Sequence, residues 1–249
     1  MGKYIFERQE KKYVLSSEHY DMIIPYIQAN CIPDEYFESN VLSIYFDTEN
    51  SRIIRQSIDK PAYKEKLRLR AYEVPTSDST VYVEVKKKVS GVVYKRRIAI
   101  KYHEAVDYLE KNLPPPCQSQ ITREIDYMKT FYGGLKPAMF ISYHRFSYID
   151  KINPNVRVTF DDQVISRETD LRLDKGIYGR NLLDGGIRLM EVKSIGPMPL
   201  WLADALDECK IFPDSFSKYG NAYKELLSEG YYSFIKPNGI PKKGELNLA

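Results

Sequence analysis

Every second side chain between residues 63 and 72 is basic, and this alternation restricts the fold more than any other feature of the sequence. The basic positions are Lys64, Lys66, Arg68 and Arg70, and the positions between them are Glu65, Leu67, Leu69 and Ala71. Side chains two residues apart point to the same face of a β-strand. The segment therefore predicts a strand with one basic face and one largely apolar face.

Five other segments have polar faces of a similar kind. Those faces carry Arg8, Glu10 and Lys12; Tyr82, Glu84 and Lys86; Lys95 and Arg97; Arg157, Thr159 and Asp161; and Glu191 and Lys193. An alternating strand usually belongs to a half-solvated sheet, with its apolar face toward the core. Here bases predominate on most polar faces, and like charges that oppose each other across strands repel. If helices cover the apolar faces, the bases point into a lumen where a polyanion would offset the repulsion.

The predicted elements fit an α+β fold, an eight-stranded antiparallel β tunnel with helices packed outside. Strands are predicted at 7–15, 41–47, 63–73, 80–89, 92–101, 138–148, 156–164 and 189–195. Helices are predicted at 18–29, 103–112, 118–132, 200–210 and 218–229. Pro25 is expected to kink or stop the first helix, and Gly133-Gly134 to cap the third.

Length and composition favour a single domain of an ordinary soluble protein. The chain has 249 residues, of which 1–235 are predicted to form the domain and 236–249 a polar C-terminal tail. The three cysteines are odd in number and widely spaced, which indicates neither a disulfide framework nor a zinc site. The sequence shows no signal peptide and no membrane segment of about 20 apolar residues. We therefore expect a cytoplasmic protein with reduced cysteines.

The acidic residues on the basic faces have two interpretations. Glu10, Glu84, Asp161 and Glu191 neutralise neighbouring bases, or some of them bind Mg²⁺ or Mn²⁺. These ions prefer carboxylate oxygens and bridge to substrate phosphates. Glu191, which lies between apolar neighbours, is the first choice for the metal, and Glu10 and Glu84 are further candidates.

Seven motifs together resemble the VTC polyphosphate polymerase domain, in its stand-alone bacterial form. They are Glu7-Arg-Gln-Glu-Lys-Lys-Tyr13, Lys66-Leu-Arg-Leu-Arg70, Val83-Glu-Val-Lys86, Tyr143-His-Arg145, Val156-Arg-Val-Thr-Phe-Asp161, Leu189-Met-Glu-Val-Lys193 and Ser215-Phe-Ser-Lys-Tyr219. That domain belongs to the CYTH, or triphosphate tunnel metalloenzyme, superfamily. No single motif is specific, but the order and spacing of the seven together are, and the resemblance covers roughly residues 5–230, nearly the whole chain.

The resemblance implies a polymerase that transfers the γ-phosphate of ATP onto a growing inorganic polyphosphate chain, with Mn²⁺ or Mg²⁺. The implied phosphate ligands are Lys12, Arg68, Arg70, Lys86, Lys95, Arg145, Arg157 and Lys218. Tyr143 and Ser217 would assist, and Glu191 would hold the metal. The basic faces add Arg8, Lys66, Arg97 and Lys193 as substrate-binding candidates.

Two positions depart from the family pattern. Arg8 stands where the wider superfamily has the first Glu of a Glu-x-Glu-x-Lys motif, which argues against a phosphatase or cyclase that holds metal with several carboxylates. Ser215 stands where the polymerase pattern has a lysine, which removes one expected tunnel contact. The SPX module and membrane segment of the fungal complex are not seen in this sequence, so coupled translocation is not expected.

Phosphoryl transfer needs in-line positioning and charge stabilisation from the protein and little covalent chemistry. No covalent intermediate is therefore expected, and His144 alternates away from Tyr143 and Arg145. Two other functions stay open: a non-catalytic polyphosphate or inositol-phosphate binding module, and a tripolyphosphatase, which Arg8 disfavours. Nucleic acid is not an expected partner, because the bases alternate inward and few aromatic residues lie among them.

Overall fold

The computed structural model describes residues 8–59, 61–90 and 92–235, with side chains over 9–59, 61–90 and 92–228. Its strands are β1 (Arg8–Leu15), β2 (Cys31–Asp47), β3 (Tyr63–Ala71), β4 (Thr80–Val89), β5 (Val92–Lys101), β6 (Lys136–Asp150), β7 (Arg157–Arg167), β8 (Arg180–Asn181) and β9 (Arg188–Ile195). Its helices are α1 (Ser17–Asn30), α2 (Arg52–Ile58), α3 (Tyr102–Leu109), α4 (Gln120–Phe131), α5 (Leu200–Glu208) and α6 (Lys218–Ile235), with a 3₁₀ turn at Leu173–Lys175. The predicted tail at 236–249 lies outside the described residues.

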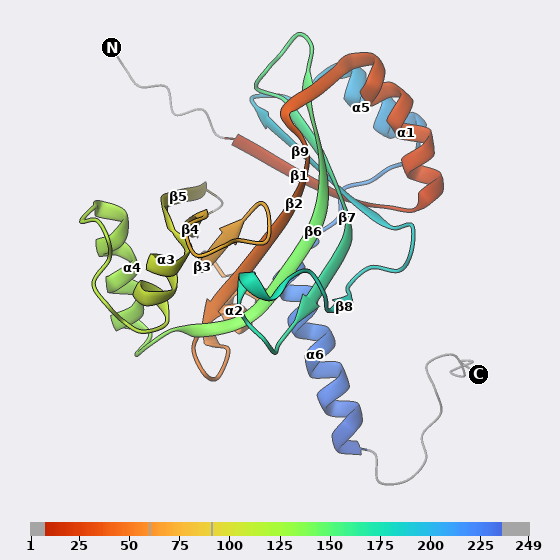
Figure 1. Ribbon diagram of the computed structural model, residues 1–249. Helices are drawn as coiled ribbons and strands as arrows, with labels where there is room; N and C mark the ends of the chain where they lie inside the picture. Colours follow the sequence, from red (N-terminus) through yellow and green to blue (C-terminus); the bar gives the residue numbers. More distant parts are fainter. Residues whose placement is uncertain (1–7, 60, 91, 236–249) are drawn as a thin grey trace.

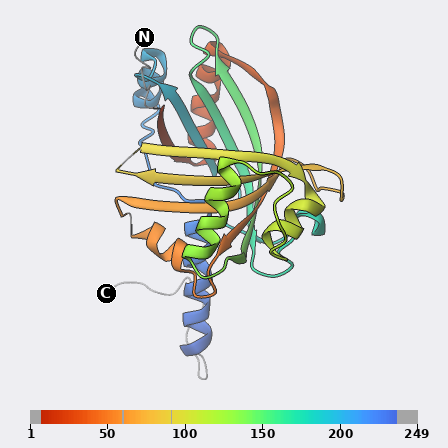
Figure 2. The ribbon, with the colours of Figure 1, turned by 90° about the vertical axis from the view of Figure 1, so that its left-hand side faces the viewer.

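The strands form one antiparallel sheet in the order β1-β9-β7-β6-β2-β3-β4-β5, with the short β8 paired to β7. The sheet is strongly curled, so that β3, β4 and β5 run across β6 and β7 in the view of Figure 2. β1 and β5 are its two edges in the described chain, and they do not pair with each other. The eight predicted strands are thus confirmed as an antiparallel sheet, whose hydrogen-bonded ladder is not closed into a ring.

Two apolar clusters cover the convex side of the sheet. Under α3 and α4, the outward faces of β2, β3 and β4 contribute Leu42, Ile44, Leu67, Leu69, Val81 and Val83. Under α1 and α5, the outward faces of β1, β7 and β9 contribute Tyr13, Leu15, Val158, Phe160, Met190 and Val192. Figure 1 shows these two helix pairs on opposite arms of the sheet. Because period-2 alternation sends these apolar side chains outward, the basic positions between them face the concave side.

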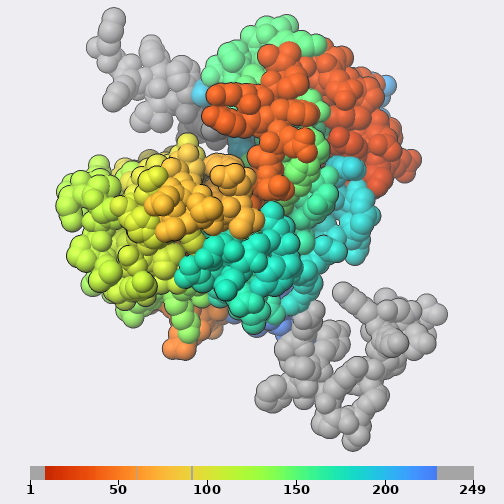
Figure 3. Space-filling view, in the orientation of Figure 1, coloured from red at the N-terminus to blue at the C-terminus, as the bar shows by residue number. Residues whose placement is uncertain are grey.

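The sixth helix occupies a different place from the others. The first turns of α6 bring Tyr219, Ala222 and Tyr223 into contact with an apolar part of the concave face, which includes Tyr45 and Ile141. From there α6 extends away from the body of the molecule (Figure 1). Side chains fill the space between the arms of the sheet in the space-filling view (Figure 3). The start of α6 therefore forms one boundary of the concave basic surface.

Several elements differ from the sequence predictions for identifiable reasons. β2 begins at Cys31, ten residues before the predicted start at 41. The sequence did not indicate this part of the strand, because its residues are mostly exposed and polar and carry no apolar alternation. Helix α2 was not predicted. The N-cap residue of α2, Ser51, makes no side-chain capping bond. Instead the carboxylate of Asp47 accepts hydrogen bonds from the backbone N–H groups of Ile53 and Ile54, each at 2.9 Å, and so holds the first turn of α2. Pro25 lies inside α1 without ending it.

Candidate phosphate-binding site

The concave faces of β3, β4 and β5 place three cations around one buried carboxylate. Glu84, whose side chain is 1% exposed, accepts from Nε of Arg68 at 2.7 Å and lies 2.8 Å from Nζ of Lys95. Nε of Arg70 lies 3.9 Å from the same carboxylate. Burial alone would raise the pKa of Glu84, but Arg68, Arg70 and Lys95 outweigh it and lower this pKa to about 2. This arrangement favours the ion-pair interpretation of Glu84 over a role as metal ligand.

A second buried carboxylate, on β7, joins two further predicted phosphate ligands. Asp161 accepts two hydrogen bonds from Arg145, from Nε at 2.6 Å and Nη2 at 2.8 Å, and a third from Nζ of Lys218 at 2.6 Å. Burial opposes ionisation of Asp161, yet Lys218 and Arg145 lower its pKa to about 2. The ammonium group of Lys218 also lies 4.3 Å from the centre of the Tyr143 ring. Strands β6 and β7 and the start of α6 therefore meet at Asp161.

Strands β1 and β9 supply a group of two acids and two bases. Oε2 of Glu191 accepts from Nζ of Lys193 at 2.7 Å and lies 3.6 Å from Nη2 of Arg145. Lys12 lies 3.4 Å from Glu10, and both Lys12 and Glu10 interact with Glu191. Burial alone would raise the pKa of Glu191, but Lys193 and the other neighbours hold this pKa well below its usual value. Glu191 and Glu10, two of the three carboxylates that the sequence offers as metal ligands, thus lie together.

Side chains bridge the gap between the two sheet edges that the hydrogen-bonded ladder leaves open. Nζ of Lys86, on β4, lies 3.8 Å from Oε2 of Glu10, on β1. Lys12 donates to the carbonyl oxygen of Phe216 at 3.2 Å, and Lys66, on β3, donates to Oγ of Ser217 at 3.3 Å. The segment before α6 therefore contacts both sides of the gap, and the basic surface becomes continuous across it.

Tyrosine hydroxyls complete the surface, one of them unforeseen. Arg70 donates to the hydroxyl of the predicted Tyr143 at 3.3 Å, and Arg68 donates to that of Tyr45 at 3.1 Å. Burial alone would raise the pKa of Tyr45, but Arg68, Arg70 and Lys66 lower it to about 7. Tyr45 was missed because it lies in an apolar stretch of β2. Its alternation with Ser43 was the only signal that it faces the basic strands.

Most of the predicted residues lie together, and Arg157, Arg97 and Arg8 lie apart from them. One continuous cluster, called the basic cluster below, contains Lys12, Lys66, Arg68, Arg70, Lys86, Lys95, Tyr143, Arg145, Lys193, Ser217 and Lys218 with Glu10, Glu84, Asp161 and Glu191. Arg157 is separate from this network and pairs at 2.8 Å with Asp34 on β2. Arg97 lies over the ring of Tyr82. The backbone of Arg8 pairs with Ile195, and its side chain is outside the described part of the molecule.

A cavity of about 10 Å³ lies beside Lys12, Asp161, Glu191, Phe216 and Lys218. That volume is about what a single water molecule needs. A phosphate group is larger than this cavity, so a phosphate bound between these side chains would displace some of them.

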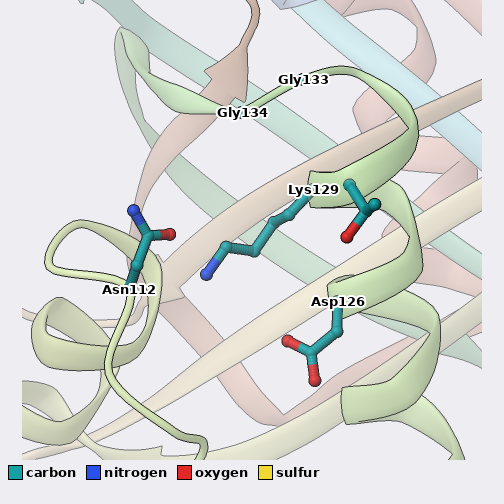
Figure 4. Close-up of a pocket in the computed structure, with 6 residues that line it drawn as sticks. Asn112, Asp126, Lys129, Gly133 and Gly134 are labelled. Carbon is teal, nitrogen blue, oxygen red and sulfur yellow. The ribbon is translucent and has the colours of Figure 1, made fainter.

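A larger hollow lies on the outside of the molecule, beside α4 (Figure 4). It is lined by Asn112, Asp126, Lys129, Thr130, Gly133 and Gly134. Its charged groups serve the local structure: Lys129 donates to the carbonyl oxygen of Tyr108 at 2.9 Å, and Asp126 accepts from the Tyr108 hydroxyl at 2.8 Å. It shares no residue with the basic cluster.

Comparison with known families gives a clear assignment. The profile of the VTC domain matches residues 7–227. The chain belongs to the VTC domain family. The match spans every strand of the sheet and the first half of α6, so the basic cluster of this VTC domain lies wholly within it.

Solved structures of similar fold are distant from this VTC domain. A candidate adenylate cyclase from Bacillus halodurans is 13% identical, with a TM-score of 0.48, covering 96% of this chain and 97% of that chain. A candidate adenylyl cyclase from Hippeastrum with a dominant triphosphatase activity is 13% identical, with a TM-score of 0.49, covering 90% and 96%. Sequence identities and TM-scores this low do not allow the substrate or reaction of either protein to be assigned to this chain. No curated protein compared with the chain matches it. In the described residues, no helix is long and apolar enough to cross a membrane.

Proposed function

We propose that this VTC domain is an ATP:polyphosphate phosphotransferase, which transfers the γ-phosphate of ATP to the end of an inorganic polyphosphate chain. The observation that carries the proposal is the basic cluster, in which bases from β1, β3, β4, β5, β6, β9 and α6 face a common interior. Arginine binds phosphate oxygens through paired N–H donors, whereas lysine acts as a point charge. Such a surface fits a chain of phosphates better than a single small anion. We propose the cytoplasm, where ATP is abundant, as the location of the reaction.

The chain's own residues would act on the reaction by position and charge. Arg145 and Lys218, held by Asp161 on one side of the cluster, and Arg68 and Arg70 on the other, would stabilise negative charge on the transferring phosphoryl group. The acceptor oxygen of a polyphosphate end is already ionised, so no side chain has to remove a proton from it. His144 is bonded to Glu38 and Asp162 and belongs to none of these contacts, so no phosphohistidine is proposed.

Glu191 and Glu10 are the residues that fit a divalent metal. Glu191 also lies among cations, but it interacts directly with the second carboxylate of Glu10, whereas the partners of Glu84 in the described residues are the cations Arg68, Arg70 and Lys95. No group of three or more His, Cys, Asp or Glu side chains suited to a metal occurs in the described residues. Mg²⁺ is commonly bound by one or two carboxylates together with substrate phosphates, so this pair would hold an ion shared with the substrate. Bound there, Mn²⁺ or Mg²⁺ would neutralise phosphate charge and orient the phosphates for transfer.

The test is incubation of the purified chain with ATP, Mn²⁺ and a short polyphosphate primer. The expected result is ADP together with an acid-labile polymer longer than the primer. Orthophosphate released without any polymer would indicate a hydrolase instead. Tight polyphosphate binding with no ADP, unchanged by Glu191→Ala, would indicate a non-catalytic binding module, which needs the same basic wall.

A further inference from the structure

Aromatic and guanidinium groups meet at one end of the concave face of β3, β4 and β5. The guanidinium carbon of Arg97, on β5, lies 4.5 Å from the centre of the Tyr82 ring, on β4. Tyr72, just after β3, meets the same ring edge-on, with the centroids 5.8 Å apart. Tyr72 is 43% exposed and Arg97 is also exposed. This group combines an apolar ring face, a cation and access to solvent.

Arg97 differs from the arginines of the basic cluster in what holds it. Arg68, Arg70 and Arg145 each lie within ion-pair distance of a buried carboxylate. Arg97 makes no ion pair or hydrogen bond with the residues that the structure describes, and its contact is the Tyr82 ring. A planar guanidinium that covers a ring with one face keeps its other face free for a second planar group.

The register places this group next to the predicted phosphate ligands. Arg97 lies opposite Glu84, and Tyr82 lies opposite Arg70. Arg97 and Lys95 share a face two residues apart, as do Tyr82 and Glu84, so each pair is separated by about 7 Å along its strand. A ribose can bridge such a spacing between a phosphate and a base.

A third tyrosine approaches from the other arm of the sheet. Tyr36, on β2, is 72% exposed, and Glu35, with a smaller contribution from Tyr82, raises the pKa of its hydroxyl. In Figure 3 the orange-red residues of β2 border the orange and yellow residues around the β3–β4 connection. The ring contacts of this group thus come from Tyr82 on β4 and Tyr72 at the end of β3.

We propose that Arg97, Tyr82 and Tyr72 form the subsite for the nucleobase of the phosphoryl donor. The base stacks on the free face of Arg97, with the triphosphate extending along β4 and β5 into the basic cluster. This inference rests on the proposed function for its nucleotide donor. Stacking on rings and guanidinium planes tolerates any base, because every base has a π-face. The subsite should therefore favour nucleoside triphosphates over inorganic triphosphate, while ATP and GTP bind about equally.

The test compares binding of ATP, GTP and inorganic tripolyphosphate by calorimetry, without any requirement for turnover. Tyr82→Ala and Arg97→Lys, which keeps the charge but loses the plane, should each weaken ATP and GTP about tenfold, since one stacked base contributes about 1–3 kcal/mol. Both variants should leave tripolyphosphate affinity within about twofold of wild type on this reasoning. Tyr82→Phe, which keeps the ring, should bind ATP as wild type does. Tyr127→Ala, at an exposed tyrosine of α4, is the matched control.

The outcomes separate this inference from the proposed function. Retained tripolyphosphate binding by Tyr82→Ala also shows that the variant is folded. If ATP binds the wild type and the variants lose nothing, or lose ATP and tripolyphosphate equally, the base subsite is wrong and the polymerase proposal is untouched. If tripolyphosphate binds and ATP does not bind the wild type, the nucleotide donor itself is wrong, and the base subsite with it.

Discussion

The carboxylate of Asp161 connects Arg145, on β6, to Lys218, the first residue of α6, with three hydrogen bonds of 2.6 to 2.8 Å. Asp161 itself is only 1% exposed. It does not need to touch substrate to matter, because it fixes the positions of two predicted phosphate ligands from separate parts of the chain. This relationship makes the start of α6 part of the site.

Replacement of Asp161 by Asn should therefore affect stability and activity together. Removing one partner of a buried ion pair leaves the other charges uncompensated and typically costs about 3–5 kcal/mol. We expect a comparable loss in the free energy of unfolding, measured by urea titration, and a fall in kcat larger than the change in KM for polyphosphate. Asp162→Asn, at the neighbouring outward position, is the control. Wild-type kcat in a folded Asp161→Asn variant would contradict the positioning role.

Acid should destabilise the protein over a narrow pH window. Glu84 and Asp161 both have folded-state pKa values of about 2, against unfolded values near 4. A carboxyl group whose pKa is lowered by folding stabilises the folded state above its unfolded pKa, and this contribution is lost as the pH falls through the folded pKa. The free energy of unfolding should therefore fall between about pH 4 and pH 2. The Asp161→Asn variant should show a shallower pH dependence there, and an equal slope would exclude Asp161 as a source.

Arg68 and Glu84 should behave as a coupled pair. If repulsion between like charges were the only effect, truncation of Arg68 or Arg70 would leave the stability unchanged or raise it. The structure changes that expectation, because Arg68 lies 2.6 Å from the buried Glu84. Arg68→Ala should cost about 1–3 kcal/mol of stability, since it leaves a buried acceptor short of a donor. In the double variant Arg68→Ala with Glu84→Gln the loss should be less than the sum of the two single losses. Additive losses in urea titrations would show that the two side chains are not coupled.

The sequence correctly predicted which side chains share a face of the sheet where apolar and polar residues alternate strictly. In β3 and β4 the period-2 pattern alone identified Arg68, Arg70, Glu84 and Lys86 as one surface, because apolar residues between them leave no other register. The long-range pairs were harder. No local pattern shows that Lys218 reaches Asp161, since 57 residues separate them and the contact depends on how α6 enters the sheet.

Tyr45 shows a second limit of sequence reasoning. Its chemical character comes from neighbours on other strands, Arg68 and Arg70, and from its stacking on Tyr219, with ring centroids 4.7 Å apart. A tyrosine in an apolar run predicts a core residue, and Tyr45 is indeed 8% exposed. Only the assembled sheet shows that the hydroxyl end of this core residue meets the basic cluster.

Phosphate binding should weaken above neutral pH, in part through Tyr45. The pKa of Tyr45 is lowered to about 7 and that of Lys66, by burial, to about 8. As the pH rises through these values, a phenolate forms beside Arg68 while Lys66 loses its charge, so both changes disfavour a bound polyanion.

The lowered pKa of Tyr45 also means that the phenolate adds stability to the folded state progressively from pH 7 toward the unfolded pKa near 10. Tyr45→Phe should therefore bind tripolyphosphate with a smaller loss of affinity between pH 7 and pH 9, and should lack that alkaline gain in stability. Calorimetric binding and urea unfolding at both pH values measure the two effects, and identical pH profiles for Tyr45→Phe and wild type would show that Tyr45 does not titrate in this range.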